Sequence, residues 1–122
     1  MAEKLYYAWE EFVEDSERIG KLVEVESKKR KRQFDGVYGI PRGGMILAVC
    51  LSHRLGIPML LAPTKRSLIV DDIADTGKTL AHFRDLRCFI ATLFYHPRSI
   101  VKPDVWLRKK GSAWIVFPWE RE

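Results

Sequence analysis

Residues 68–80 read LIVDDIADTGKTL, which sets three carboxylates and a Thr-Gly-Lys-Thr turn at the end of an apolar run. Gly77 permits backbone angles that other residues avoid, while Thr76 and Thr79 supply hydroxyl groups. Successive backbone N–H groups at the start of a helix, aided by the helix dipole, bind phosphate. The turn is therefore a candidate phosphate site, with an ordinary helix cap as the alternative.

This turn lacks the glycine spacing of a nucleoside-triphosphate P-loop. That motif needs a glycine five positions before the glycine of Gly-Lys-Thr, and the residue there is Asp72. A P-loop is therefore excluded. Any phosphate at this turn must be bound by its hydroxyls and backbone donors in the company of the preceding acids.

Asp71 and Asp72 come directly after the apolar run of this strand, and strand alternation predicts that their side chains point to opposite faces. Because an unpaired buried carboxylate costs several kcal/mol, both should face a polar cleft, a partner or a cation. Hydroxyl-rich ligands and Mg²⁺ both suit carboxylate oxygens. Asp75 stands at the mouth of the turn, whose donors would keep it ionised, and it is a candidate general base.

A second loop, PRGG at residues 41–44, follows another short apolar run. Its two glycines permit a close backbone approach to a ligand, and the planar guanidinium of Arg42 matches phosphate oxygens. A simple turn with a surface arginine is the alternative. Two anion-binding loops at one sheet edge, together with the carboxylates, describe a ligand with anionic groups at both ends and hydroxyls between them. Phosphoribosyl pyrophosphate has this shape.

The elements that must position these loops alternate between strands and helices. Helices are predicted over residues 8–31, 45–55 and 77–87, and strands over 36–40, 58–62, 67–73, 89–96 and 105–109. Near-continuous apolar strands are typical of a parallel sheet covered on both faces. The predicted fold class is α/β, with a central, mostly parallel sheet of about five strands flanked by helices in a single domain, residues 1–122. Both loops follow strands, at the sheet edge where such folds bind ligands.

The helix predicted over residues 8–31 is amphipathic. Its apolar stripe consists of Phe12, Val13, Ile19, Leu22 and Val23. Acids crowd its first half and bases its end, as the helix dipole favours. The KKRKR run at residues 28–32 is therefore interpreted as the solvated end of this helix, and nucleic acid is not an expected partner.

Composition and charge narrow the classes of protein. The formal net charge is +5, with 47% hydrophobic and 30% charged residues, which is typical of a soluble globular protein. No apolar stretch is long enough for a membrane span and no secretory signal pattern is present, so a cytoplasmic protein without a membrane partner is expected. Cys50 and Cys88, both among apolar neighbours, are expected to be buried reduced thiols.

The stretch at residues 68–80 resembles the signature of type I phosphoribosyltransferases: an apolar strand, two acids, then Asp-Thr-Gly-x-Thr. The likeness is to the purine branch, the xanthine–guanine and hypoxanthine enzymes, and it extends through YAWEEF, GIPRGGMILAVCLSHRLGIP, TLFYHP and AWIVFPWE. It implies that family's fold with a small C-terminal hood. The implied reaction is purine salvage, in which a purine base and phosphoribosyl pyrophosphate give a nucleoside monophosphate and pyrophosphate, with Mg²⁺ as cofactor.

The resemblance implies roles for both anion-binding loops. The 5′-phosphate would be held by the turn, at Asp75, Thr76, Gly77, Lys78 and Thr79. The pyrophosphate would meet the other loop, at Pro41, Arg42 and Gly43. In relatives the peptide bond before this arginine is often cis.

The resemblance also implies roles around the sugar and the base. Asp71 and Asp72 would face the ribose hydroxyls and the Mg²⁺ ion, and Asp75 would be the base or acid near the purine imidazole. Trp114 would stack on the purine, with backbone groups of Ile115 at its edge. A core tryptophan and an ordinary strand isoleucine are the alternatives. A homodimer is the assembly that the family implies.

Two positions depart from the family pattern. A long flexible loop usually separates the second and third strands, whereas only residues 63–66 do so here. The lysine that usually follows the fourth strand and contacts the purine 6-oxygen is replaced by His96, a donor with pH-dependent charge, or else a surface loop residue. The first departure leaves a second function open, a non-catalytic regulatory protein that binds phosphoribosyl pyrophosphate or a nucleotide on the same fold.

Overall fold

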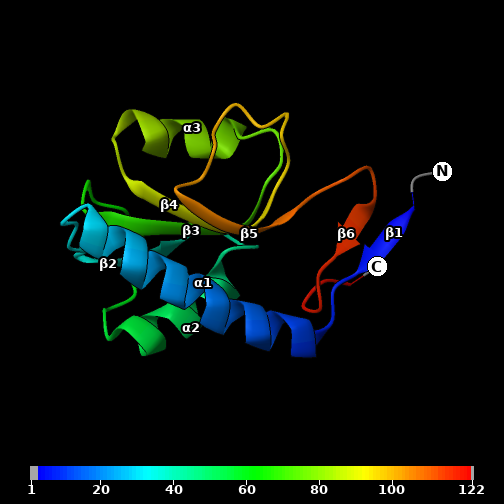
Figure 1. The fold of residues 1–122 in the computed structure, drawn as a ribbon, viewed down its shortest axis with the longest axis horizontal. Helices are drawn as coiled ribbons and strands as arrows, with labels where there is room; N and C mark the ends of the chain where they lie inside the picture. The colour runs from blue at the N-terminus through cyan, green and yellow to red at the C-terminus, as the bar shows by residue number, and fades with distance from the viewer. Residues whose placement is uncertain (1–2, 122) are drawn as a thin grey trace.

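Four parallel strands form the central sheet of this computed structural model, which describes residues 3–121 (Figure 1). In spatial order they are β2 (Gly36–Gly39), β3 (Ser67–Ala74), β4 (Phe89–Tyr95) and β5 (Val105–Lys109). Every neighbouring pair is parallel, which confirms the predicted type of sheet. The carboxyl ends of these strands therefore meet at one edge.

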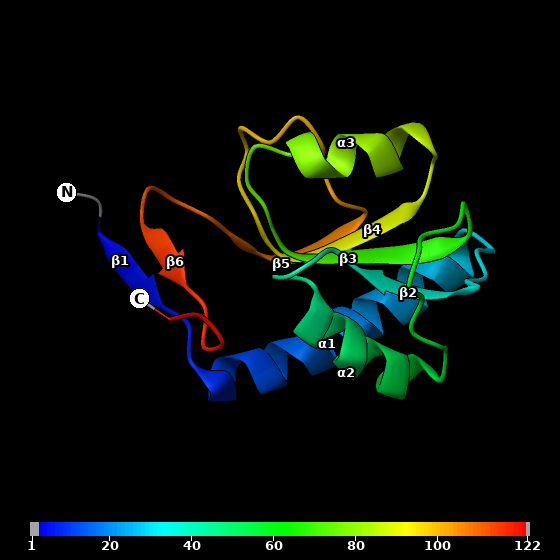
Figure 2. The same cartoon turned by 180° about the vertical axis from the view of Figure 1, so that it is seen from behind.

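Helices cover both faces of the sheet. α1 (Trp9–Lys29) and α2 (Met45–Leu55) pack on one face, and α3 (Lys78–Asp85) lies on the other (Figures 1 and 2). α2 has the predicted bounds, because basic residues occupy its last turn and Gly56, with a φ of 65°, ends it. The α/β class is thus confirmed. None of the helices within residues 3–121 has the length and apolar character to cross a membrane.

β3 carries the centre of the core. Leu68 and Val70 are fully buried in the cluster that includes side chains of α1 and α2. Ile69, between them, is fully buried in a second cluster that includes side chains of α3. Alternation along one strand thus supplies both sides of the sheet, and burial of each such side chain stabilises the fold by about 1.5–3 kcal/mol.

The segment predicted as a strand at residues 58–62 is not one, so the central sheet has four strands rather than about five within the described chain. Met59 makes one isolated bridge to β2, and Leu61 is fully exposed. Apolar character alone does not bury a segment. The chain instead turns back, and the Asp35 N–H donates to the Arg66 carbonyl oxygen at 3.0 Å, just before β2 and β3 begin.

The buried face of α1 differs from the predicted stripe. Val13 and Leu22, both predicted on that face, are exposed. Asp15 and Ser16, which are polar, are buried instead. The helix lies within the predicted range and ends at Lys29, so the KKRKR run spans the end of the helix.

A second, small sheet forms the hood at one end of the molecule, where β1 (Lys4–Tyr6) pairs in parallel with β6 (Trp114–Val116) (Figures 1 and 2). β1 is not among the predicted strands. Aromatic rings fasten the hood to the core, in a cluster of Tyr7, Phe12, Phe94, Phe117 and Trp119. Contacts of this kind contribute about 0.5–1.5 kcal/mol each beyond simple burial.

The two cysteines are free, as predicted. Cys88 is buried and Cys50 is partly buried. Burial raises the pKa of both thiols, which favours their protonated form.

A buried carboxylate, Asp15 of α1, joins three parts of the fold. Its side chain is 1% exposed, and it accepts hydrogen bonds from Tyr7 Oη at 2.5 Å and from Arg108 Nε of β5 at 2.6 Å. Burial and the Asp15 carboxylate raise the pKa of Tyr7, so the phenol stays a donor. The cluster therefore holds the segment before α1, α1 itself and β5 in one arrangement.

We expect Asp15→Ala to lower the free energy of unfolding by about 3 kcal/mol, because it leaves a partly buried guanidinium and a buried phenol without their acceptor. Urea denaturation followed by circular dichroism measures the change. Glu14→Ala is the control, since Glu14 is an exposed neighbour on the same helix and should change stability by less than about 0.5 kcal/mol. Equal losses in both variants would contradict this role for Asp15.

Candidate functional site

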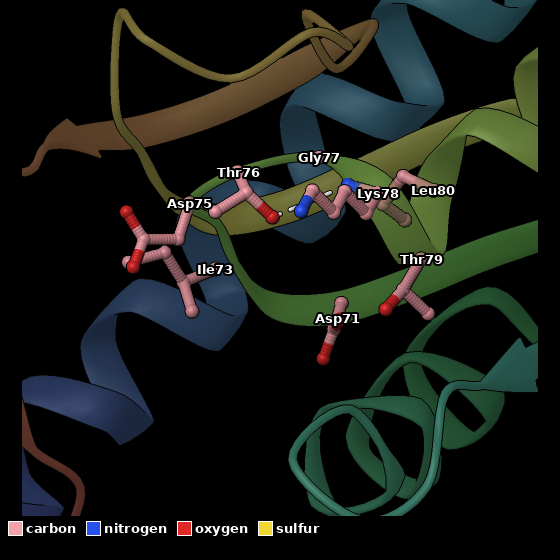
Figure 3. Close-up of a pocket in the computed structure, with 8 residues that line it drawn as sticks. All are labelled: Asp71, Ile73, Asp75, Thr76, Gly77, Lys78, Thr79 and Leu80. Carbon is pink, nitrogen blue, oxygen red and sulfur yellow. Dashed lines mark hydrogen bonds between the residues drawn. The ribbon is translucent and has the colours of Figure 1, made fainter.

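Three adjoining cavities open at the carboxyl edge of the central sheet. The turn cavity, of about 120 Å³, is lined by Asp71, Ile73, Asp75, Thr76, Gly77, Lys78, Thr79 and Leu80 (Figure 3). The central cavity, of about 810 Å³, is lined by Ile40, Pro41, Arg42, Gly43, Ile46, Asp71, Asp72, Thr79, Trp119, Glu120 and Arg121. The aromatic cavity, of about 150 Å³, is lined by Asp72, Ile73, Asp75, Lys110, Trp114, Ile115, Phe117 and Glu120.

The acids that follow the apolar part of β3 lie where these cavities meet. Asp71 lines the turn and central cavities, and Asp72 lines the central and aromatic cavities. Asp75 lines the turn and aromatic cavities. One short stretch of sequence therefore borders all three cavities, and the fold brings residues 41–43 and Trp114 to it from distant parts of the chain.

The turn at residues 75–79 begins α3 with the geometry of an anion site. Gly77 precedes the helix with a φ of 82°, and a Cβ there would lie 2.4 Å from Ser99 Oγ, so both the angle and the space require glycine. The Lys78 N–H donates to Thr76 Oγ1 at 3.4 Å (Figure 3). The first N–H groups of a helix lack helical acceptors, so those of Thr79 and Leu80, which follow Lys78, are available at this end of the turn cavity.

Asp71 and Asp72 both line the central cavity, as expected for acids that should face a polar cleft. β2 ends at Gly39, which pairs with Val70, and beyond this point the strand edge is open to both side chains. Burial and the neighbouring Asp72 charge raise the pKa of Asp71 to about 8, and burial also raises the pKa of Asp72. Within residues 3–121 no cation pairs with either acid, and such a pair favours a bound cation or hydroxyl donors.

The PRGG loop rests on the end of β3 because it contains two glycines. A Cβ on Gly43 would lie 2.3 Å from Asp72 Oδ2. A Cβ on Gly44 would lie 2.3 Å from the Val70 carbonyl oxygen. Any side chain at these positions would push the loop away from the acids, so glycine sets the width of the central cavity.

Arg42 is available to an anion in the central cavity. The Pro41–Arg42 peptide bond is cis, as the resemblance implies. Arg42 is exposed, lines the cavity and makes no ion pair with any acid among residues 3–121. A phosphate group bound in this cavity would therefore have the guanidinium of Arg42 available as a partner.

Asp75 is ionised because two cationic side chains bind it. Arg98 donates to Oδ1 from two nitrogens, at 3.1 and 2.8 Å, and Lys110 Nζ donates to Oδ2 at 3.3 Å. Partial burial opposes ionisation, but these hydrogen bonds outweigh it and lower the pKa of Asp75. Figure 3 shows the carboxylate turned away from Thr79. Ionised Asp75 agrees with the sequence prediction, but the cause is these cations and not the donors of the turn.

The aromatic cavity brings together two of the three residues that the resemblance assigns to a purine. Trp114 is 60% exposed, so it is not a core tryptophan, and Ile115 beside it is buried. His96, the third, is not among the residues that line this cavity. Its Nδ1 accepts a hydrogen bond from the Arg98 N–H at 3.0 Å, within the loop that follows β4.

Lys110 is a residue of the site that sequence reasoning missed. It follows β5 directly, and its N–H donates to the Tyr95 carbonyl oxygen at 2.8 Å, which holds it beside the end of β4. In the sequence, Lys109 and Lys110 look like two solvated charges. The rule that ligands bind at carboxyl ends of parallel strands, applied to β5 as well as to the first strands, is the signal that points to it.

The raised pKa of Asp71 makes the stability of the fold depend on pH. Its carboxyl has an ordinary value of 3.8 and a folded value of about 8, so the folded state holds the proton more tightly than the unfolded state does. The stability that this group contributes is therefore present below about pH 4 and is lost as the pH rises towards 8. Asp71→Asn removes this loss.

We expect Asp71→Asn to match the wild type at about pH 4 and to exceed its free energy of unfolding by about 0.5–2 kcal/mol at about pH 8. Urea denaturation at both pH values measures the difference. Asp85→Asn, an exposed carboxylate at the end of α3, is the control and should show no pH-dependent gain. A gain of the same size at both pH values would rule out titration as the cause.

Known proteins resemble this chain along most of its length, although no family model matches it. The xanthine–guanine phosphoribosyltransferase of Cereibacter sphaeroides is 26% identical, over 94% of this chain and 86% of its own length. That of Nitratidesulfovibrio vulgaris is 25% identical, over 93% and 83%.

Solved structures resemble the fold throughout. The purine phosphoribosyltransferase of Pyrococcus horikoshii is 30% identical, with a TM-score of 0.80 over 98% of this chain and 95% of that one. The xanthine–guanine–hypoxanthine phosphoribosyltransferase of Helicobacter pylori is 23% identical, with a TM-score of 0.79 over 93% and 92%, and shares the fold. With such a likeness in sequence and in architecture from end to end, this chain belongs to the purine branch of the type I phosphoribosyltransferase family.

Proposed function

We propose that this protein transfers the phosphoribosyl group of phosphoribosyl pyrophosphate to a purine base, giving a nucleoside monophosphate and pyrophosphate in purine salvage. The observation that carries the proposal is the meeting of three cavities at the acids of β3 and the turn after it. The turn cavity, the central cavity with its acids and Arg42, and the aromatic cavity adjoin one another. Their order matches that of the phosphate, the sugar with its pyrophosphate, and the base in such a ligand.

Each part of the ligand has a place in this proposal. The 5′-phosphate occupies the turn cavity at residues 75–79, and the ribose hydroxyls face Asp71 and Asp72. The pyrophosphate meets the PRGG loop at Arg42, and the purine lies against Trp114 in the aromatic cavity. The shared lining residues of neighbouring cavities let one continuous molecule occupy all three.

The charges of the site suit the transfer. The bond from the ribose to pyrophosphate breaks, the bond to a purine nitrogen forms, and positive charge develops on the sugar while negative charge develops on the leaving group. The carboxylates lie by the sugar and Arg42 lies by the leaving group, and charge placed where charge develops is the largest usual source of catalysis. Ionised Asp75 is an acceptor for the proton that the purine imidazole loses.

Mg²⁺ is part of the proposal. Among residues 3–121 no group of three or more His, Cys, Asp and Glu side chains could hold a metal ion. Mg²⁺ is commonly held by one or two carboxylates together with the phosphates of its substrate, and the adjacent, cation-free Asp71 and Asp72 fit that pattern. Bound there, the ion would supply positive charge to the pyrophosphate.

The short connection before β3 favours one alternative, a regulatory protein that binds phosphoribosyl pyrophosphate or a nucleotide without turnover. Residues 63–66 lie at the amino end of the sheet, where Thr64 Oγ1 donates to Asp35 Oδ2 at 2.9 Å, and not over the cavities. Water therefore reaches the site unless the hood or a partner subunit covers it, and charges act more weakly through water.

We also propose a homodimer, as the family implies. Exposed apolar side chains lie on α2 and on the segment after it, at Met45, Val49, Met59 and Leu61. Such side chains are favourable to bury against a second copy.

Incubation of the protein with Mg²⁺, phosphoribosyl pyrophosphate and each of guanine, hypoxanthine, xanthine and adenine tests the transfer. We expect nucleoside monophosphate and pyrophosphate in equal amounts from at least one base. Asp72→Asn should lower kcat/KM by about 100–1,000-fold, because it removes charge facing the reacting sugar. Asp85→Asn, away from the cavities, should leave kcat/KM unchanged.

If neither the wild type nor Asp75→Asn forms product from any of the four bases, the proposed transferase activity is excluded. Calorimetric titration with phosphoribosyl pyrophosphate then separates the alternatives. Saturable binding without turnover supports the regulatory protein, and no binding excludes both.

The dimer makes a separate prediction. Light scattering coupled to size-exclusion chromatography should give twice the monomer mass of 14.2 kDa. Val49→Asp on α2 should convert the protein to a monomer, because a charge is then buried without a partner. Val13→Asp, at another exposed helical valine, is the control and should leave the mass unchanged. A monomeric wild type would disprove the homodimer.

A further inference from the structure

Lys110 is a nearly buried cation to which neither the resemblance nor the sequence assigns a role. Its side chain is 11% exposed, although its neighbour Lys109 is exposed. The N–H bond to Tyr95 holds the backbone at the end of β5, so the side chain has a fixed origin beside the aromatic cavity that it lines. Because burial of an ammonium group is costly, a compensating interaction is required.

The side chain lies between an acid and an aromatic ring. Its Nζ is 3.3 Å from Asp75 Oδ2 and 5.8 Å from the centroid of the Trp114 ring. Neutralising Asp75 does not by itself require Lys110, because Arg98 already donates to that carboxylate from two nitrogens. An ammonium group has three protons to donate, and the bond to Asp75 uses one of them.

The wall of the aromatic cavity thus presents an acceptor and a donor side by side. Ionised Asp75 only accepts hydrogen bonds, and Lys110 only donates them. Both groups line the cavity together with Trp114, and the Lys110 ammonium lies over the face of that ring, so a flat ring bound against Trp114 is within reach of both. The complementary edge carries a ring N–H, which faces Asp75, beside a carbonyl oxygen, which faces Lys110, whereas an amino group in place of the carbonyl would set a donor against the ammonium.

We propose that Lys110, paired with Asp75, makes this site specific for 6-oxopurines by donating a hydrogen bond to the carbonyl oxygen next to the imidazole N–H that Asp75 accepts. This inference rests on the proposed purine site, and it assigns the choice between purine bases at that site to Lys110, which directly follows β5. His96, which lies outside the lining of the cavity and whose Nδ1 is already engaged by the Arg98 N–H, does not carry it.

The test compares Lys110→Met with Lys109→Met, a matched change at the adjacent exposed lysine. At saturating phosphoribosyl pyrophosphate, Lys110→Met should raise the KM for hypoxanthine by about 10–100-fold, the usual loss for a hydrogen bond to a charged group. The KM for adenine should change far less, so the preference between the bases collapses. Lys109→Met and His96→Ala should keep the preference, and Lys110→Arg, which keeps a donor, should restore most of it.

Binding of the two products gives a readout that does not depend on turnover. Quenching of tryptophan fluorescence measures the Kd of inosine monophosphate and of adenosine monophosphate for each variant. The wild type should bind inosine monophosphate more tightly, and Lys110→Met should bind both about equally. If this holds without turnover, the catalytic proposal fails and the assignment of Lys110 stands.

The comparison of variants can overturn the assignment through the following results. They are a wild-type preference for adenine or adenosine monophosphate, loss of the preference in His96→Ala but not in Lys110→Met, and equal loss for both bases in Lys110→Met. Failure of the wild type to bind either nucleotide would also overturn it. Turnover with an unchanged preference in Lys110→Met would leave the proposed reaction standing and remove Lys110 from it.

Discussion

The candidate site depends on one close packing contact, between the PRGG loop and the end of β3. Gly43 lies against the Asp72 carboxylate and Gly44 against the Val70 carbonyl, at distances where a Cβ would collide. Because β2 ends opposite Val70, the loop that leaves it turns directly across the open strand edge. Arg42 and the acid pair are thereby set on the same cavity, although nearly thirty residues separate them in sequence. The width of the central cavity follows from this contact.

The acids of this region are kept in opposite electrostatic states. Asp71 and Asp72 lie together without a cationic partner in the part of the chain that the structure describes, and burial raises the pKa of both. Asp75, only a few residues later, is bound by two cations that lower its pKa. The first pair is thus prepared to gain a cation or hydroxyl donors, and the third acid is prepared to accept a hydrogen bond. Environment, not residue type, separates these tasks.

Much of this architecture could be predicted because its strands are apolar on both sides. The run at Leu68–Val70 indicates a buried parallel strand, and the basic end and glycine after Leu55 mark the limit of α2. The segment at 58–62 is equally apolar but fails as a strand, since a sequence does not show whether a partner strand is within reach. β1 is too short for a periodic signal. The burial of Asp15 in α1 could not be predicted, because acidic side chains on a helix usually face water. Its burial depends on the hydrogen bonds from Tyr7 and Arg108, which lie outside this helix.

The same difficulty affects the site. The signature stretch could be interpreted from local chemistry, because turn, hydroxyls and acids are neighbours in the chain. The role of Lys110 could not be predicted in this way, since it depends on contacts with Asp75 and Trp114. The folding of the sheet and the hood brings these two residues to Lys110 from other parts of the chain. Likewise, Asp71 and Asp72 line one cavity only because β2 ends before them and leaves the edge of β3 open, and the sequence does not show where β2 ends.

The connection at residues 63–66, held at the amino end of the sheet, has a kinetic consequence. Enzymes that close a long loop over their substrate must order that loop on each binding event, and its reopening often limits product release. A ligand of this protein would enter and leave without that step at this connection. The same openness admits mobile salt ions to the charged walls, so dissolved electrolyte would compete with a phosphorylated ligand more strongly than in a sealed site.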